Sequence, residues 1–224
     1  MQTNILYRPA HTIAQVALSP GESIVAESGA MIGMSSNVQI ATQSGGIMKG
    51  LKRMLLGGES FFRNTFTAHG GPGEVLLAHA LCGDIVPLEM TQAGYYVTSS
   101  SFIASSPSIE IDTKSQGLRG LFSGEGLFSL KATGGPGTLI VGAFGGIQEL
   151  VCDGSLVIDT GHLVCWDTTL QYKVGKSGSG WIASMLSGEG LVCHFQGQGR
   201  IWIQSRNPQA YGQAVAKVLP PRQG

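Results

Sequence analysis

A glycine-rich segment occurs three times in this chain at a nearly constant spacing. Each copy contains a Gly-Glu step, and its glutamates are Glu59, Glu125 and Glu189, separated by 66 and then 64 positions. Self-similarity at a fixed period of this length is the signature of a chain built from structural repeats. We place the repeats at residues 19–92, 93–154 and 155–208, followed by a C-terminal tail at residues 209–224.

The repeats predict a single domain that covers residues 1–224. A repeat of about 65 residues has a weak core of its own, so we expect the three repeats to share one interior. The segment Thr12 to Leu18 alternates in a way that predicts a strand, and Ser19-Pro20-Gly21 then supplies turn residues.

The front halves of the three repeats align so that Met31, Phe102 and Leu163 occupy equivalent positions. Alternating apolar residues in these halves predict paired strands of a β-meander. The later turn Gly70-Gly71-Pro72-Gly73 has the composition of a hairpin, because glycine accepts a positive φ and proline restricts its own.

Short apolar connectors at residues 47–56, 118–122 and 181–186 predict helical turns between the strands. A further short helix is expected after Asn207-Pro208 and before Pro220. Many short strands at even spacing, repeated three times, predict an all-β, closed or rolled architecture with pseudo-threefold symmetry and short helical connectors.

Three segments resemble a known family: Glu27 to Met31, Gly58 to Phe62, and Gly70 to Ala78, each with later echoes in the chain. They are similar to the bacterial branch of the mitochondrial biogenesis family called altered inheritance of mitochondria, formerly a domain of unknown function. The resemblance covers nearly the whole chain. It implies three tandem copies of a short double-stranded β-helix, similar in fold to the tryptophan RNA-binding attenuator protein, and it implies no catalytic residues.

The charge balance argues against nucleic acid as a partner. Lysine plus arginine and aspartate plus glutamate number 14 each, which gives a formal net charge of zero, whereas nucleic-acid binding needs clustered basic charge. The chain has no apolar run long enough to span a membrane. We therefore expect a cytoplasmic protein, with peripheral contact to the inner membrane as an alternative location.

The four cysteines, Cys82, Cys152, Cys165 and Cys193, are widely spaced and flanked by apolar residues. They contain no Cys-x-x-Cys pair, so we expect buried reduced thiols rather than disulfides or a zinc site. The histidines show no metal-binding spacing, and the serines lack the Gly-x-Ser-x-Gly elbow of hydrolases. No cofactor and no enzymatic activity are expected.

Glu59, Glu125 and Glu189 are the sharpest candidate site. If they face a common axis, three carboxylates provide oxygen ligands suited to a hard cation. The alternative is that each glutamate accepts hydrogen bonds from backbone amides and recurs because the fold recurs. We favour the structural alternative.

The connector at residues 47–56 is the second candidate. On a helix, its apolar residues share one face while Lys49, Lys52 and Arg53 lie on the other, a pattern typical of helices that lie on anionic membranes. The alternative is that the apolar face packs on the protein itself or on a partner. The basic residues are special to the first connector.

The function predicted from these observations is that of a non-enzymatic, self-associating scaffold or interaction protein, and hence a homo-oligomer whose other protein partner is unknown. Two alternatives remain open at this point. One is a peripheral membrane protein that docks through residues 47–56. The other is a small-molecule or metal-ion binder at the axis between the repeats.

Overall fold

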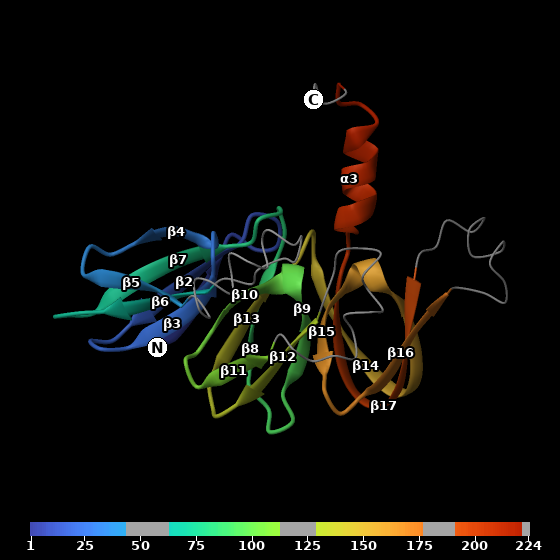
Figure 1. The fold of residues 1–224 in the computed structure, drawn as a ribbon, viewed down its shortest axis with the longest axis horizontal. Helices are drawn as coiled ribbons and strands as arrows, with labels where there is room; N and C mark the ends of the chain where they lie inside the picture. Colours follow the sequence, from blue (N-terminus) through green and yellow to red (C-terminus); the bar gives the residue numbers. More distant parts are fainter. Residues whose placement is uncertain (44–62, 113–128, 177–190, 221–224) are drawn as a thin grey trace.

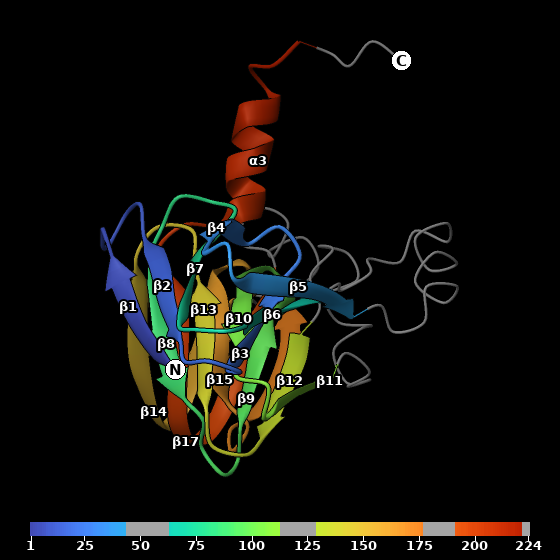
Figure 2. The same ribbon diagram turned by 90° about the vertical axis from the view of Figure 1, so that its left-hand side faces the viewer.

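The computed structural model describes residues 1–43, 63–112, 129–176 and 191–220. Within these ranges the protein is built from curled β-sheets with one α-helix (Figure 1), which confirms the all-β prediction. The three connectors expected to be helical lie outside the described residues. Figure 2 looks at the molecule from its N-terminal end and shows the strong twist of the strands.

The first sheet has four strands and lies at the N-terminal end of the molecule. Its alternating pattern is clear in β2, where Ala14, Val16 and Leu18 are buried while the residues between them are not. The strand predicted at residues 12–18 is therefore confirmed. In spatial order, the sheet contains β1 (Gln2–Leu6), β2 (Ile13–Leu18), β7 (Gly73–Ala78) and β4 (Met31–Met34).

The second sheet joins the N-terminal part of the chain to its middle. Its central contact is the antiparallel pair of β3 with β10, in which Ala26 lies opposite Ala104. In spatial order, the sheet contains β5 (Val38–Gln43), β6 (Arg63–Ala68), β3 (Ser23–Glu27), β10 (Phe102–Ser105), β13 (Thr138–Gly142) and β8 (Ile85–Glu89).

The third sheet joins the middle of the chain to its C-terminal part. Its central contact is the antiparallel pair of β9 with β15, in which Val97 lies opposite Cys165. In spatial order, it contains β11 (Ile109–Asp112), β12 (Ser129–Gly134), β9 (Tyr95–Thr98), β15 (Leu163–Asp167), β17 (Leu191–Gln204) and β14 (Ile147–Asp159), and β16 (Gln171–Lys176) also pairs with β17.

The turn at residues 70–73 joins two sheets and is not a hairpin. β6 belongs to the second sheet and β7 to the first, and β12 and β13 are likewise separated. The backbone at Gly73 lies close to the Val38 side chain at the start of β5. Glycine permits this approach, because a Cβ atom at position 73 would lie 2.7 Å from Val38 Cγ2. The hairpin prediction was therefore wrong. The β-meander prediction was also wrong, because β3, β4 and β5 do not pair with one another.

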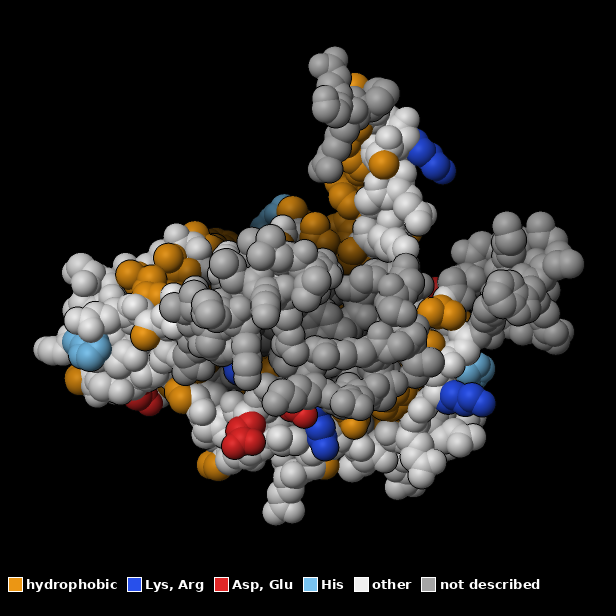
Figure 3. Space-filling model, viewed as in Figure 1, with side chains coloured by type: hydrophobic (Ala, Val, Ile, Leu, Met, Phe, Trp, Pro, Cys, Tyr) orange, Lys and Arg blue, Asp and Glu red, His pale blue; other side chains and the backbone are white. Residues whose placement is uncertain are grey.

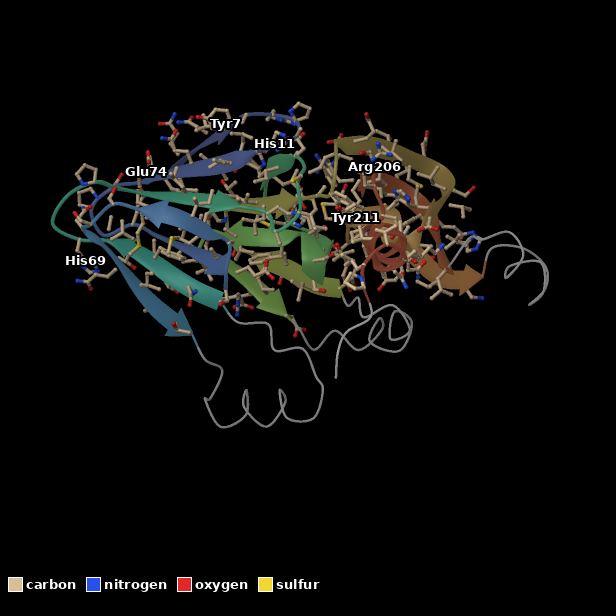
Figure 4. All side chains as sticks on the ribbon, turned by 90° about the horizontal axis from the view of Figure 1, so that it is seen from above. Tyr7, His11, His69, Glu74, Arg206 and Tyr211 are labelled. Atoms are coloured by element: carbon tan, nitrogen blue, oxygen red, sulfur yellow. The ribbon has the colours of Figure 1, made fainter. Side chains whose placement is uncertain are left out.

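The buried apolar side chains of the described residues form three clusters. The first contains Phe66 and Val75, the second Tyr95 and Val97, and the third Trp166. The sheets follow one another along the longest axis of the molecule (Figures 1 and 4), so each cluster lies beside the next. No pair among the described strands joins the first sheet to β14. The described strands therefore do not connect the three sheets into a closed ring.

The C-terminal helix α3 (Pro208–Ala216) confirms the helix expected after Asn207. The Asn207 side chain caps it by accepting hydrogen bonds from the amides of Gln209 at 2.9 Å and Ala210 at 3.1 Å. The helix rises away from the sheets (Figures 1 and 2). Its contact with the body includes Tyr211, whose ring lies 5.0 Å from that of Phe144 in an edge-on arrangement.

Two short 3-10 helices precede strands in the second and third sheets. They are η1 (Ser99–Ser101), before β10, and η2 (Thr160–His162), before β15. Asp159 supports η2, because its carboxylate accepts a hydrogen bond from the Gly161 amide at 2.8 Å. Each 3-10 helix ends at the residue before its strand, so β10 begins at Phe102 and β15 at Leu163.

Candidate interaction surface

The residues singled out in the sequence lie outside the described part of the chain. This holds for Glu59, Glu125 and Glu189, and equally for the basic connector residues. The described residues contain no group of three or more His, Cys, Asp or Glu side chains that could hold a metal ion. The metal site and the basic contact surface therefore stay predictions.

A row of apolar side chains is exposed on β4, at the edge of the first sheet. Met31 is 36% exposed, Ile32 53% and Met34 39%. Figure 3 shows hydrophobic side chains gathered at this end of the molecule, over β4 and β7. We call Met31, Ile32 and Met34 the β4 edge. Its only neighbour among the described strands is β7, so one side of its backbone is unpaired there.

A second apolar edge lies at the opposite end of the molecule, on β14. This strand is the last in the third sheet, and Val157 in its C-terminal part is 54% exposed. Leu156 and Ile158 beside it are partly buried and pack against the third apolar cluster. We call residues 156–158 the β14 edge.

Asp84 is a buried carboxylate whose contacts are structural. It accepts hydrogen bonds from Arg8 Nε at 3.0 Å and Arg8 Nη2 at 2.7 Å. Thr12 Oγ1 at 3.3 Å and the Ile85 amide at 2.9 Å both donate to Asp84 Oδ1, which also accepts from Arg8 Nε. Two elements, the loop after β1 and the start of β8, are held together by this cluster, which leaves the carboxylate little capacity for a ligand.

A second charged pair crosslinks strands of the third sheet. Asp167 Oδ2 accepts hydrogen bonds from the Arg200 amide at 2.8 Å and from Arg200 Nε at 3.2 Å. Arg200 also donates to the Tyr95 hydroxyl at 3.2 Å and lies over the Trp202 ring. Partial burial raises the pKa of Tyr95, which keeps its hydroxyl protonated. This cluster forms one wall of a hollow of about 500 Å³ beside Asp153.

Another hollow, of about 530 Å³, lies over β16 and β17. Its size is within the range of small-molecule sites, but its lining includes Gln171, Lys173, His194 and Gln196. Such sites usually have mainly apolar walls with a few polar groups. Four of the six lining residues are polar or charged, so the lining is more polar in residue type than is usual for such sites.

Three of the four cysteines are buried as expected, and Cys82 is not. Burial raises the pKa of Cys193 to about 12 and raises that of Cys165 well above the ordinary thiol value. Both groups are therefore protonated at neutral pH. Cys82 lies in the turn between β7 and β8 and is exposed. The prediction of burial was wrong for this residue.

The helices within the described ranges are too short or too polar to cross a membrane. Figure 4, which looks down on α3 from above, shows Arg206 and Tyr211 near the helix.

Comparison with known proteins places nearly the whole chain in one family. The model of the family described as mitochondrial biogenesis AIM24 matches residues 3–206. An uncharacterized protein of Streptococcus pyogenes serotype M6 is 30% identical over 217 residues, which cover 93% of this chain and 87% of that protein. A crystal structure of a protein from Streptococcus pyogenes, solved by a structural genomics consortium, superposes with a TM-score of 0.81 at 29% identity, covering 97% of this chain and 99% of that one. The chain therefore belongs to the mitochondrial biogenesis AIM24 family.

Proposed function

We propose that this protein is a non-enzymatic scaffold that associates with copies of itself. The observation that carries the proposal is the β4 edge, where three large apolar side chains are exposed next to unpaired backbone. Natural proteins usually protect such edges with charged residues or proline, and Met31–Met34 contains neither. An apolar, unprotected edge favours contact with another protein surface.

The polar groups of the described residues support a structural rather than a catalytic role. Asp84 and Asp167 each pair with an arginine and a backbone amide, so their hydrogen-bonding capacity is used in holding strands together. The two hollows lack an arrangement of nucleophile, base and oxyanion donors. A scaffold needs none of these.

Three tandem repeats of a short double-stranded β-helix are the architecture that we infer for this scaffold. Two features recur. β4, β10 and β15 begin at Met31, Phe102 and Leu163, the positions that align in the sequence. Each of these strands also has a register shift just after its first residue. Recurrence of a bulge at one aligned position supports a common unit.

Light scattering on the full chain at micromolar concentration tests the proposed function. We expect a discrete mass greater than that of one protomer. A monomer across the whole concentration range would contradict self-association and leave the scaffold role without its main support.

A further inference from the structure

The strands that join neighbouring parts of the molecule follow one rule. β3 pairs antiparallel with β10, and β9 pairs antiparallel with β15. In the aligned repeats, β3 and β9 correspond to the C-terminal part of β14, while β10 and β15 correspond to β4. The strands left over from this rule are therefore β4 at one end and the end of β14 at the other.

The strand order within the sheets identifies the same two strands, β4 and β14, as those without a partner of this kind. The second sheet joins the half β5-β6-β3 to the half β10-β13-β8, and the third joins β11-β12-β9 to β15-β17-β14. Two halves have no such neighbour among the described strands: β4-β7-β2-β1 and β16-β17-β14. They lie at opposite ends of the molecule (Figure 1), so one copy cannot join its own two halves.

The bulge residues show what the missing contact would bury. The register shifts in β4, β10 and β15 each skip one residue, and these are Ile32, Ile103 and Val164. Ile103 belongs to the first apolar cluster and Val164 to the second, and both are fully buried. Each bulge residue thus enters the cluster of the preceding unit. Ile32 has the same place in its strand but is exposed.

The partner strands repeat this difference. After the bulge, β10 lies opposite Ile140 and β15 lies opposite Trp202, and both side chains are buried. The equivalent residue opposite β4 is Leu76, which is only partly buried. The surface around Ile32 therefore resembles one side of the β3–β10 and β9–β15 contacts, but no described strand provides the other side.

We propose that the β4 edge of one copy pairs antiparallel with the β14 edge of a second copy, head to tail. The internal pairs define the register: Ala104 lies opposite Ala26 and Cys165 opposite Val97, which places Gly33 opposite Ile158 and Met34 opposite Val157 of the second copy. Ile32 then enters the third apolar cluster beside Leu156. This inference rests on the proposed self-association and names its surfaces.

The contact joins two different surfaces, so each dimer keeps one free edge of each kind. Addition of further copies leads to a closed ring or an open filament, depending on the rotation between neighbours. A contact of this kind predicts that two variants, each defective in a different edge, complement one another. A symmetric contact between two β4 edges makes no such prediction.

The test uses full-length Ile32→Lys and Val157→Lys, measured by light scattering alone and as an equimolar mixture. Each introduces a charge into one edge at a position that is exposed in the single copy, so the fold is retained. Val151→Lys is the matched control, because Val151 lies on β14 outside the proposed register and is 73% exposed. We expect a monomer for each edge variant, a dimer for their mixture, and the wild-type mass for the control.

The outcomes separate this inference from the proposed function. If the wild type assembles and both edge variants keep its mass, self-association stands and the head-to-tail contact is wrong. If both variants are monomers and their mixture stays monomeric, the contact is not between two different edges, which also overturns the inference. A monomeric wild type would contradict the proposed function itself.

Discussion

Ile32 and Ile103 are the same residue type at the same β-bulge of two strands, yet Ile32 is 53% exposed and Ile103 is 1% exposed. The difference lies in the neighbouring strand. β10 pairs with β3, so Ile103 is covered by the first apolar cluster, whereas the described strands provide β4 with no such cover. Burial of an isoleucine side chain contributes about 1.5–3 kcal/mol, which is the stabilisation that an added copy can supply at Ile32.

Arg8→Ala is expected to lower the free energy of unfolding by about 1–3 kcal/mol, because it leaves the buried Asp84 carboxylate without its two charged donors. Arg8→Lys should lose less, since it keeps the charge but cannot donate in the same two-pronged geometry. Urea denaturation measures both changes. An Arg8→Ala protein as stable as the wild type would show that solvent replaces these contacts at no cost.

Stability is expected to fall as the pH rises from about 4.5 to about 7, because burial raises the pKa of Glu27 from 4.5 to about 7. In this window the folded protein holds a proton that the unfolded chain has released, so deprotonation favours unfolding. The effect is on the order of 1–2 kcal/mol after allowance for solvent screening. Arg63 lies opposite Glu27 in the register of β3 and β6, and burial lowers the pKa of its guanidinium.

Glu27→Gln provides the control for this pH dependence. The variant carries no ionisable group at this position, so its urea midpoint should change less than that of the wild type between pH 4.5 and pH 8. It should also be the more stable protein at pH 8. Parallel pH profiles for the two proteins would assign the dependence to other groups.

Cys82 should be the one thiol of the four that reacts rapidly with a thiol reagent in the native protein, because Cys152, Cys165 and Cys193 are buried. Absorbance after addition of the reagent should report one fast equivalent, and four after denaturation. Cys82→Ser should remove the fast equivalent. More than one fast thiol in the wild type would indicate opening of the sheets.

Gly83→Ala is expected to destabilise the protein by about 1–3 kcal/mol, because its Cβ atom would lie 1.9 Å from the Ala143 carbonyl oxygen. Gly83 forms an isolated bridge with Gly145, and the two backbones approach too closely for a side chain. Gly146→Ala is the control, since a Cβ atom there meets nothing nearer than 3.9 Å. Thermal unfolding of the two variants should differ clearly, and equal midpoints would contradict the steric argument.

The basic connector predicts binding to anionic vesicles. Full-length protein should co-sediment with phosphatidylserine-containing vesicles, and binding should weaken with added salt, because Lys49, Lys52 and Arg53 attract anionic headgroups. Charge reversal of all three residues should abolish co-sedimentation, while neutral vesicles serve as the control. A charge-reversed protein that still sediments would exclude this segment as the membrane contact.

The sequence was sufficient where structure depends on neighbours along the chain. Alternation at Ala14, Val16 and Leu18 predicted β2, and Asn207-Pro208 predicted the start of α3, because side-chain direction in a strand and capping of a helix are local properties. Met31, Phe102 and Leu163, which align in the sequence, each begin a strand. The even spacing of many short alternating segments was enough to predict an all-β chain.

The tertiary structure decided what depends on segments far apart in the sequence. Glycine and proline at residues 70–73 predict a turn, and hence a hairpin, but they do not identify the sheet that receives the next strand. Alternation likewise assigns a residue to a face of a strand without identifying the strand beside it. Ile32 and Ile103 therefore look alike in the sequence, and only the pairing of β10 with β3 makes one of them core and leaves the other exposed.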